Sequence, residues 1–355
     1  MRLDIKIAAI LTLLVATSHA GGVARLGVKV VDSETGQPIP QIKVYGGFKN
    51  YPKAWGIGAK NNSDEEVTDS EGFCQLSGRT EAGHSSCIVR GNEGFYDSGW
   101  YSFDYEKRSA LKFGRWIPDD VIITARLDRI INPVPLYVKE ARKKYRESDI
   151  RNYTVWKKHQ GLSATNNVPV IKDISFSFDM IKGEWLPPHG NGEYEDIRFT
   201  FNETVLGWIK GRGYDGTYMT KKYRVDVVVA MPGEGNGVVE MPSNTGSGIK
   251  IRTVPYNGYI NTFSRWKGWF GGGDGIKTDC DKNRNYAFRI RTKYDASGNV
   301  ESAYYGKIYG DFNIKDVEGV EFLYYLNPTP NDRNLEWDMK NNLCPTQERI
   351  HNPQP

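Results

Sequence analysis

Alternating apolar and polar residues predict strands in the first third of the chain. Apolar side chains recur at every second position from Leu26 to Val30, and a turn at Ser33–Gly36 follows. Further strands are predicted at 41–48, after the turn at 68–73, from 87 to 90 and at 122–127. Several short strands with no helical pattern between them are typical of an antiparallel sandwich. We therefore expect a β-sandwich domain over residues 21–131.

The same alternation resumes near Ile171 and predicts a second domain over residues 170–350. Asp295–Asn299 has the composition of a hairpin turn. The predicted strands lie at 174–178, 197–201, 223–230, 249–254, 286–292, 304–309 and 320–325. We expect a larger antiparallel sandwich here, with a jelly roll as one possible arrangement.

Residues 132–169 are interpreted as a linker with a short helix. Pro133 and Pro135 favour an extended start, because proline restricts the residue before it to extended conformations. The segment 138–147 then places Glu140 at helical spacing from Lys143 and Lys144, which predicts a solvated helix.

Residues 1–20 have the pattern of a secretory signal peptide. Arg2 and Lys6 are followed by an apolar run over 7–16, and Ser18-His19-Ala20 offers a small-x-small cleavage site. Because spanning a bilayer takes about 20 apolar residues, we predict cleavage near Ala20 rather than a membrane anchor. Nothing later in the sequence predicts a membrane span, so we expect a periplasmic or extracellular protein.

Composition supports the β class and argues against nucleic-acid binding. The 355 residues include 9 Trp, 21 Tyr, 14 Phe and 38 Gly, a mixture that favours strands and tight turns. A net charge of +4, from 47 basic and 43 acidic residues, is too small to indicate a nucleic-acid partner.

The first domain resembles a known module. The motifs Val31-Asp32-x-x-Thr35-Gly36-x-Pro38-Ile39, Thr68-Asp69-x-x-Gly72-Phe73 and Ile122-x-x-Ala125-x-Leu127 look like those of a carboxypeptidase regulatory-like, transthyretin-type domain. That resemblance implies a seven-stranded Ig-like sandwich. It implies no enzymatic activity, because its motifs consist of turn-forming residues.

Three stretches of the second domain resemble a family of exported two-domain bacterial proteins that pair it with such a sandwich. They begin at Phe178, Tyr305 and Tyr325. This resemblance spans most of the chain and implies no particular chemistry.

Four cysteines leave two possibilities open. In an exported protein, disulfides are permitted, and pairing within each domain would join Cys74 to Cys87 and Cys280 to Cys344. The alternative is four buried free thiols.

Two motifs suggest ligand loops without matching a standard site. Gly211-Arg212-Gly213-Tyr214-Asp215-Gly216 has the spacing of a dinucleotide loop, but a β-rich run follows it, so we interpret it as a β-turn. Asp279, Asp281 and Asn283 alternate as in a calcium loop. The EF-hand glycine and final glutamate are missing, which leaves a looser Ca²⁺ site with Asp274 as a hypothesis. No other cofactor is expected.

An aromatic-glycine segment is the best candidate for ligand contact. Trp266, Trp269 and Phe270 precede Gly271-Gly272-Gly273, and a strand there would bury only one of its faces. Exposed aromatic rings can stack on the apolar faces of sugars, so we predict glycan contact at these three residues. Tyr51, Trp55, Trp100, Tyr101 and Trp116 could act similarly in the first domain. The alternative for all of them is core packing.

No catalytic motif is recognised, and an enzyme is not expected. The sequence has no Gly-x-Ser-x-Gly elbow and no His-Glu-x-x-His pair. We therefore predict an exported, non-catalytic binding protein that contacts glycan. A structural or assembly protein with a protein interface is the second hypothesis. The third is a glycoside-acting enzyme on a jelly roll, for which the available carboxyls are Glu193, Glu195, Asp196, Asp311 and Glu336.

Overall fold

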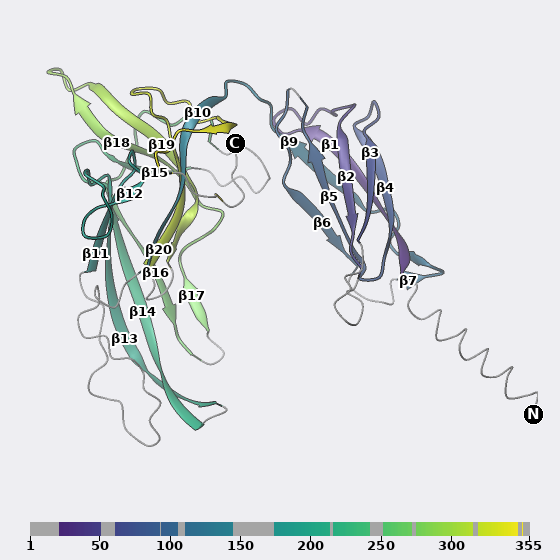
Figure 1. The fold of residues 1–355 in the computed structure, drawn as a ribbon, viewed down its shortest axis with the longest axis horizontal. Coiled ribbons are helices and arrows are strands. Elements are labelled where there is room, and N and C mark those ends of the chain that lie inside the picture. The colour runs from purple at the N-terminus through teal and green to yellow at the C-terminus, as the bar shows by residue number, and fades with distance from the viewer. Residues whose placement is uncertain are drawn as a thin grey trace, which may run out of the picture. The chain divides into compact units, whose positions relative to one another are not determined.

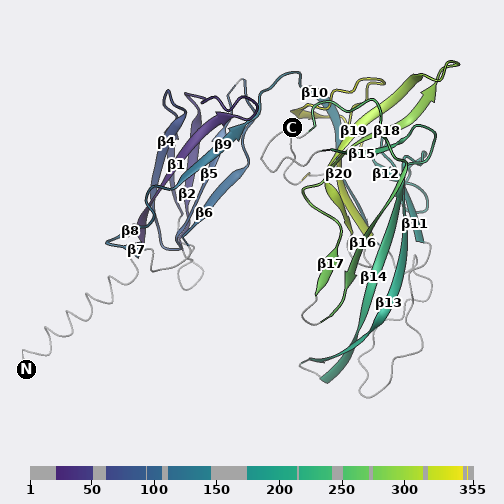
Figure 2. The ribbon, with the colours of Figure 1, turned by 180° about the vertical axis from the view of Figure 1, so that it is seen from behind.

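The computed structural model describes residues 21–50, 61–92, 94–105, 111–144, 174–213, 216–241, 251–271, 275–314, 319–346 and 350. All regular secondary-structure elements within these ranges are strands, so the predicted all-β class is confirmed. No helix long and apolar enough to cross a membrane occurs in them. The chain divides into two compact units with the main boundary between Ile131 and Asn132 (Figures 1 and 2). The predicted signal peptide lies outside the described residues.

The first unit is a sandwich of two sheets. In the five-stranded sheet, β1 (Gly22–Asp32) pairs with β4 (Phe73–Thr80), β8 (Arg115–Trp116) and β9 (Ile122–Leu127), and β8 also pairs with β7 (Leu111–Lys112). The four-stranded sheet has the order β3 (Asn62–Val67), β2 (Lys43–Phe48), β5 (His84–Arg90) and β6 (Trp100–Asp104). Seven strands were expected, and the short β7–β8 hairpin accounts for the difference.

Alternation in β1 explains how the two sheets meet. Leu26, Val28 and Val30 are fully buried and pack in one core with Val44 and Val89 from the opposite sheet. Because side chains of a strand point alternately to its two faces, this spacing places all three residues of β1 on the inner face. The first domain is therefore held by aliphatic packing between its sheets.

The second unit is also a sandwich, and each of its sheets has six strands. One sheet has the order β15 (Gly237–Met241), β18 (Asn285–Tyr294), β19 (Val300–Ile314), β20 (Gly319–Leu326), β10 (Val134–Lys144) and β21 (Trp337–Asn342). The other has the order β12 (Glu184–Trp185), β11 (Ile174–Asp179), β13 (Ile197–Gly213), β14 (Gly216–Ala230), β16 (Thr262–Trp269) and β17 (Ile276–Thr278).

Aromatic rings fill the core between these sheets. Phe199 of β13 lies 5.5 Å from Phe312 and 5.4 Å from Phe322, between ring centroids, and Phe178 of β11 lies 5.8 Å from Phe322 and from Tyr324. These five side chains are at most 2% exposed. Most of these contacts are edge-to-face or tilted, the arrangements that aromatic quadrupoles favour. The aromatic-rich composition thus supplies the core of the larger domain.

The predicted linker helix over 138–147 is wrong for its described part, because Val134–Lys144 forms β10. This strand lies between β20 and β21, and its two faces are covered in alternation. Val138 packs with Trp337 on one side, while Ala141 belongs to the aromatic core on the other. Tertiary pairing overrides the helical charge spacing, so this segment belongs to the second domain. Residues 145–173 lie outside the described part.

The strand expected at 249–254 is not formed in its described part. Ile251 and Val254 are buried in a satellite core, and Thr253 makes only an isolated bridge to Asn334. Their burial explains the apolar pattern that suggested a strand.

The predicted disulfides are absent, and all four cysteines are free. Cys74 of β4 and Cys87 of β5 share the core of the first domain from its two sheets. Burial raises the pKa of Cys74 to about 12, with the Cys87 sulfur adding to the effect, and burial raises the pKa of Cys87 to about 11. Cys280 lies by Thr278, whereas Cys344 lies by Thr346 and Gly183. The two sulfurs thus have different surroundings.

We expect Cys74 and Cys87 of the native full-length protein to resist alkylation at pH 8, because their raised pKa values leave almost no thiolate and burial blocks access. Mass spectrometry after iodoacetamide treatment without reductant measures this. In denaturant, all four cysteines should be modified under the same conditions. A mass two hydrogens lower with two unmodified cysteines would instead show a disulfide.

Candidate functional site

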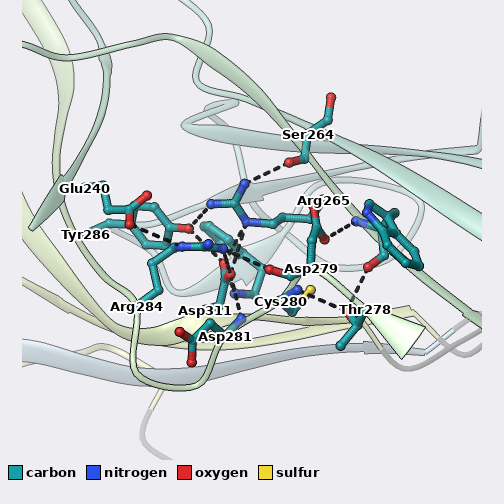
Figure 3. Close-up of polar contacts among 12 residues, drawn as sticks. Glu240, Ser264, Arg265, Thr278, Asp279, Cys280, Asp281, Arg284, Tyr286 and Asp311 are labelled. Atoms are coloured by element: carbon teal, nitrogen blue, oxygen red, sulfur yellow. Dashed lines mark hydrogen bonds and ion pairs between the residues drawn. The ribbon is translucent and has the colours of Figure 1, made fainter. Parts of the chain in front are cut away.

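A buried carboxylate, Asp311 of β19, joins the two sheets of the second domain at the middle of β16. Its side chain is 2% exposed, and Arg265 of β16 donates to it from Nε at 3.2 and 3.1 Å. Arg284 donates from Nη1 at 2.7 Å. The Tyr286 hydroxyl donates at 2.9 Å, and the Asp281 amide at 3.1 Å. Figure 3 shows these groups converging on Asp311.

The environment keeps the partners of Asp311 in the protonation states that this network needs. Burial and the Asp311 charge raise the pKa of Tyr286, so its hydroxyl stays protonated and donates. Burial lowers the pKa of Arg265, but the hydrogen bond to Tyr286 and the charge of Asp311 outweigh it and hold the pKa above its usual value. Two cations thus neutralise one buried anion, as a buried charge requires.

This network also fixes the main chain of Trp266. Arg284 donates to the carbonyl of Asp279 at 3.0 Å, and the Asp279 carboxylate accepts the Trp266 amide at 2.6 Å. On the other side of the same residue, the Thr278 hydroxyl donates to the Trp266 carbonyl at 2.8 Å. The predicted aromatic residue is therefore held at both its backbone amide and its carbonyl.

The structure brings Trp266 and Phe270 together but places Trp269 elsewhere. The rings of Trp266 and Phe270 are 6.3 Å apart and nearly perpendicular. Trp269 pairs with Tyr223, which packs against the core, so Trp269 lies on the inner face of the sheet. All three are partly buried. Of the three predicted ligand residues, two form one surface pair.

Polar side chains surround this pair on the outer face of β13, β14 and β16. Across the three strands, Asp226 of β14 lies between Trp266 of β16 and Asn202 of β13. Two residues along, Val228 of β14 lies between Ser264 and Thr200. Residues paired directly across strands share a face. The alternate residues of β14, Val225, Val227 and Val229, are at most 1% exposed. The sheet therefore buries one face and presents a hydrogen-bonding face to solvent.

The described residues of the predicted calcium loop make contacts with the protein. Asp279 accepts the Trp266 amide, and Asp281 accepts the amide of Asn283 at 2.9 Å. Asp274 lies outside the described residues. No group of three or more His, Cys, Asp and Glu suited to a metal occurs in the part of the chain that the structure describes. Calcium at this loop stays a prediction.

A second charge cluster joins the sheets at another point along β18. Arg291 donates to Asp179 at 2.7 Å and to both oxygens of Asp196 at 2.9 Å. Burial opposes ionisation of Asp179, but amide donors from Lys182, Glu193 and Tyr194, together with the Arg291 charge, hold its pKa below the usual value. Arg291 itself has φ +51°, and a register shift interrupts β18 beside it.

The five carboxyls considered for glycoside chemistry each contact their own partner. Asp196 and Asp311 belong to the two charge clusters, and Glu336 pairs with Arg252 at 2.8 Å. Glu195 accepts the Ser177 hydroxyl at 2.5 Å, and Glu193 pairs with Lys182. Each of the five carboxyls thus has at least one contact within the protein.

The Asp311 cluster could not be found by sequence reasoning. Arg265 and Arg284 are 46 and 27 residues from Asp311, and no sequence pattern relates the three residues to one another. The only local signal was the alternating Asp279-x-Asp281-x-Asn283 pattern, which indicated a polar loop there.

Asp311→Asn should strongly destabilise the second domain, because it leaves Arg265 without its ion-pair partner and leaves Arg284 with Glu240 alone. Breaking a buried ion pair costs about 3–5 kcal/mol. Hydrogen exchange of the full chain, followed by mass spectrometry, should show faster exchange in peptides from β16, β18 and β19. The control is Asp226→Asn at the exposed pair with Arg224, where the loss should stay below about 1 kcal/mol. Equal effects of both substitutions would contradict a dominant role for Asp311.

Comparisons with known proteins do not assign this chain to a family. Neither a protein-family model nor a curated protein matches it. Among solved structures, the full-length major pilin SpaD from Corynebacterium diphtheriae matches at 10% identity and a TM-score of 0.23, covering 79% of this chain and 90% of the pilin. The shaft pilin SpaA from Lactobacillus rhamnosus GG matches at 9% identity and a TM-score of 0.20, covering 61% and 90%. Similarity this low carries no argument about function.

Proposed function

We propose that this chain is an exported, non-catalytic binding protein whose second domain contacts an extracellular glycan. The observation that carries the proposal is the Trp266–Phe270 pair on a polar, solvent-facing sheet. A sugar ring has apolar faces and a rim of hydroxyls, so it needs an aromatic surface beside hydrogen-bonding groups. Asn202, Asp226 and Ser264 supply such groups on the same face.

The rigidity of this face also favours binding. Trp266 is fixed by Asp279 and Thr278, and Asp279 is tied in turn to the buried Asp311 cluster through Arg284. A ligand therefore meets side chains that are already positioned, which reduces the ordering cost of binding. The carboxyl contacts described above support a non-catalytic role, and the predicted signal peptide supports export.

A Trp266→Ala variant of the full-length protein should lose about tenfold or more in glycan affinity, since an aromatic stack contributes about 0.5–1.5 kcal/mol beyond its buried area. A glycan array followed by calorimetry on the best ligand measures the loss. Trp100→Ala is the matched control, because Trp100 is 69% exposed in the first domain. Circular dichroism verifies that both variants fold.

Unchanged affinity in Trp266→Ala, or an equal loss in Trp100→Ala, would contradict the proposed surface. Repeating the measurement with EDTA tests the calcium hypothesis: a loss of affinity that added Ca²⁺ restores would assign an ion to the loop at Asp279 and Asp281.

A protein interface in the first domain is the second candidate function. Trp100 begins β6, which pairs only with β5 among the described residues, and Ile122 of β9 is 62% exposed. An outermost strand offers unpaired backbone groups to another chain, and exposed apolar side chains favour such contact.

If this candidate is correct, the full-length protein should form larger species as its concentration rises, and Trp100→Lys should keep it monomeric. Sedimentation velocity over a hundredfold concentration range measures this. A monomer at every concentration would exclude self-association through β6, and an Ile276→Lys control in the second domain should leave any association unchanged.

A further inference from the structure

An arginine side chain lies over the ring of Trp266. The guanidinium carbon of Arg224 is 4.5 Å from the centroid of this ring, within the range of cation–π attraction. Arg224 belongs to β14 and lies directly across from Gly268 of β16, two residues beyond Trp266. Its side chain therefore runs back toward Trp266 from the neighbouring strand and covers part of the ring that the proposed glycan would use.

A carboxylate holds this arginine in place. Asp226 lies two residues along β14, and its Oδ1 accepts hydrogen bonds from Nε and Nη2 of Arg224 at 2.9 and 2.7 Å. Asp226 is also the residue directly across from Trp266. The guanidinium is thus held between an aromatic ring and a carboxylate that are neighbours on adjacent strands.

The glycine at the centre of this group allows the second ring to approach. A Cβ at Gly268 would lie 2.6 Å from the Tyr223 carbonyl oxygen and 2.9 Å from Cε2 of Phe270, so a side chain there would displace the Phe270 ring. Lys277 of β17 lies across from Gly268 on the other side, and its Nζ is 5.4 Å from the centroid of that ring. Each ring of the aromatic pair is therefore accompanied by a cation.

A sugar and the guanidinium compete for the same surface of Trp266. Stacking brings the carbon atoms of a sugar to about 3.5–4.0 Å from the aromatic carbons, where dispersion attraction is greatest. A guanidinium carbon 4.5 Å from the ring centroid already occupies this layer. A sugar can therefore stack on this face of the ring only after Arg224 has moved aside.

The contacts that hold Arg224 are weak enough for a ligand to replace them. The side chains of Arg224 and Asp226 are 42% and 40% exposed. An exposed ion pair and an exposed cation–π contact together correspond to about a three- to thirtyfold change in an equilibrium constant. A side chain held this weakly stays over the ring in the free protein and gives way to a ligand that makes a larger contact.

We infer that Arg224 is a displaceable cover over the Trp266 ring, held closed by Asp226, which a glycan must move aside in order to stack. This inference rests on the proposed glycan function and adds a residue that limits the affinity of that site. The apparent affinity of a ligand is reduced by the fraction of molecules in which the binding surface is available. Removing the cover should therefore strengthen binding, although it removes a side chain that adjoins the ligand.

The first test needs no ligand. Hydroxyl-radical footprinting of the full-length protein, read at single residues by tandem mass spectrometry, measures how fast Trp266 is oxidised. We expect Arg224→Ala to raise this rate about twofold or more, because the rate follows the fraction of molecules in which the ring is uncovered. Trp269 is the internal reference, since it lies on the inner face of the same strand and its rate should not change.

The second test measures binding to neutral glycans. An array that includes cellohexaose and chitohexaose identifies ligands, and calorimetry gives their dissociation constants. We expect Arg224→Ala to bind about three- to thirtyfold more tightly than the unmodified protein. Arg224→Gln, which keeps a polar side chain but loses the charge, should change the affinity in the same direction.

Arg198→Ala is the matched control for the loss of one positive charge. Arg198 is an exposed arginine on the outer face of the same sheet, where it pairs with Glu195 at 3.6 Å. Its removal should leave both the oxidation of Trp266 and the affinity unchanged. Circular dichroism verifies that all variants fold.

Ionic strength gives an independent readout of the ion pair that holds the cover. Because salt weakens exposed ion pairs, the affinity of the unmodified protein for a neutral glycan should rise between about 0.05 and 0.5 M NaCl. Arg224→Ala lacks this ion pair, so its affinity should depend less on salt.

Each remaining outcome overturns a stated claim. Unchanged oxidation of Trp266 or unchanged affinity in Arg224→Ala overturns the cover and leaves the glycan function standing. Weaker binding by Arg224→Ala assigns the arginine to the binding surface itself, and an equal gain in Arg198→Ala shows a general charge effect; both also overturn the cover. Failure of the unmodified protein and of Arg224→Ala to bind any array glycan overturns the proposed glycan function, and this inference with it.

Discussion

The second domain depends on how it neutralises the buried carboxylate of Asp311. A charge taken out of water is stable only if its partners are close and its lone pairs are used, and both conditions are met here. Arg265 reaches it from the opposite sheet, and Arg284 and Asp281 reach it from the loop before β18. Because these donors come from separate elements, satisfying one anion fixes the positions of two sheets and a loop.

The Arg291 cluster applies the same constraint at the other end of β18, with the charges reversed. There one partly buried cation is shared by Asp179 at the end of β11 and Asp196 directly before β13, in the sheet that also carries Arg265. The aromatic core alone could pack in several registers, since ring contacts are broad and weakly directional. Two networks with fixed donor and acceptor geometry select one register. We interpret them as determinants of specificity more than of net stability.

Sequence reasoning succeeded where one side of a strand is apolar and failed where distant residues meet. The alternation of Ile174, Phe176 and Phe178 predicted β11, because the burial of one face imposes a period of two. It failed at β10, where Lys139 and Lys143 occupy buried positions: Lys139 donates to the Thr346 carbonyl, and Lys143 contacts His189 at 2.9 Å. Their basic character indicated a solvated helix, and only their distant partners explain the strand. The disulfide prediction paired cysteines by domain, and for Cys280 and Cys344 a shared domain proved a poor guide to shared surroundings.

The outer sheet face presents a different physical problem, which is how to keep an aromatic pair at a polar surface in water. Placing Arg224 over Trp266 and Lys277 over Phe270 covers part of each ring with a hydrated cation, so the face stays soluble without losing its apolar surface. Arg224 is further held by Asp226, so the ring it covers keeps a defined environment. The arrangement therefore keeps the aromatic pair at the outer face of the sheet, while the inner face packs into the aromatic core.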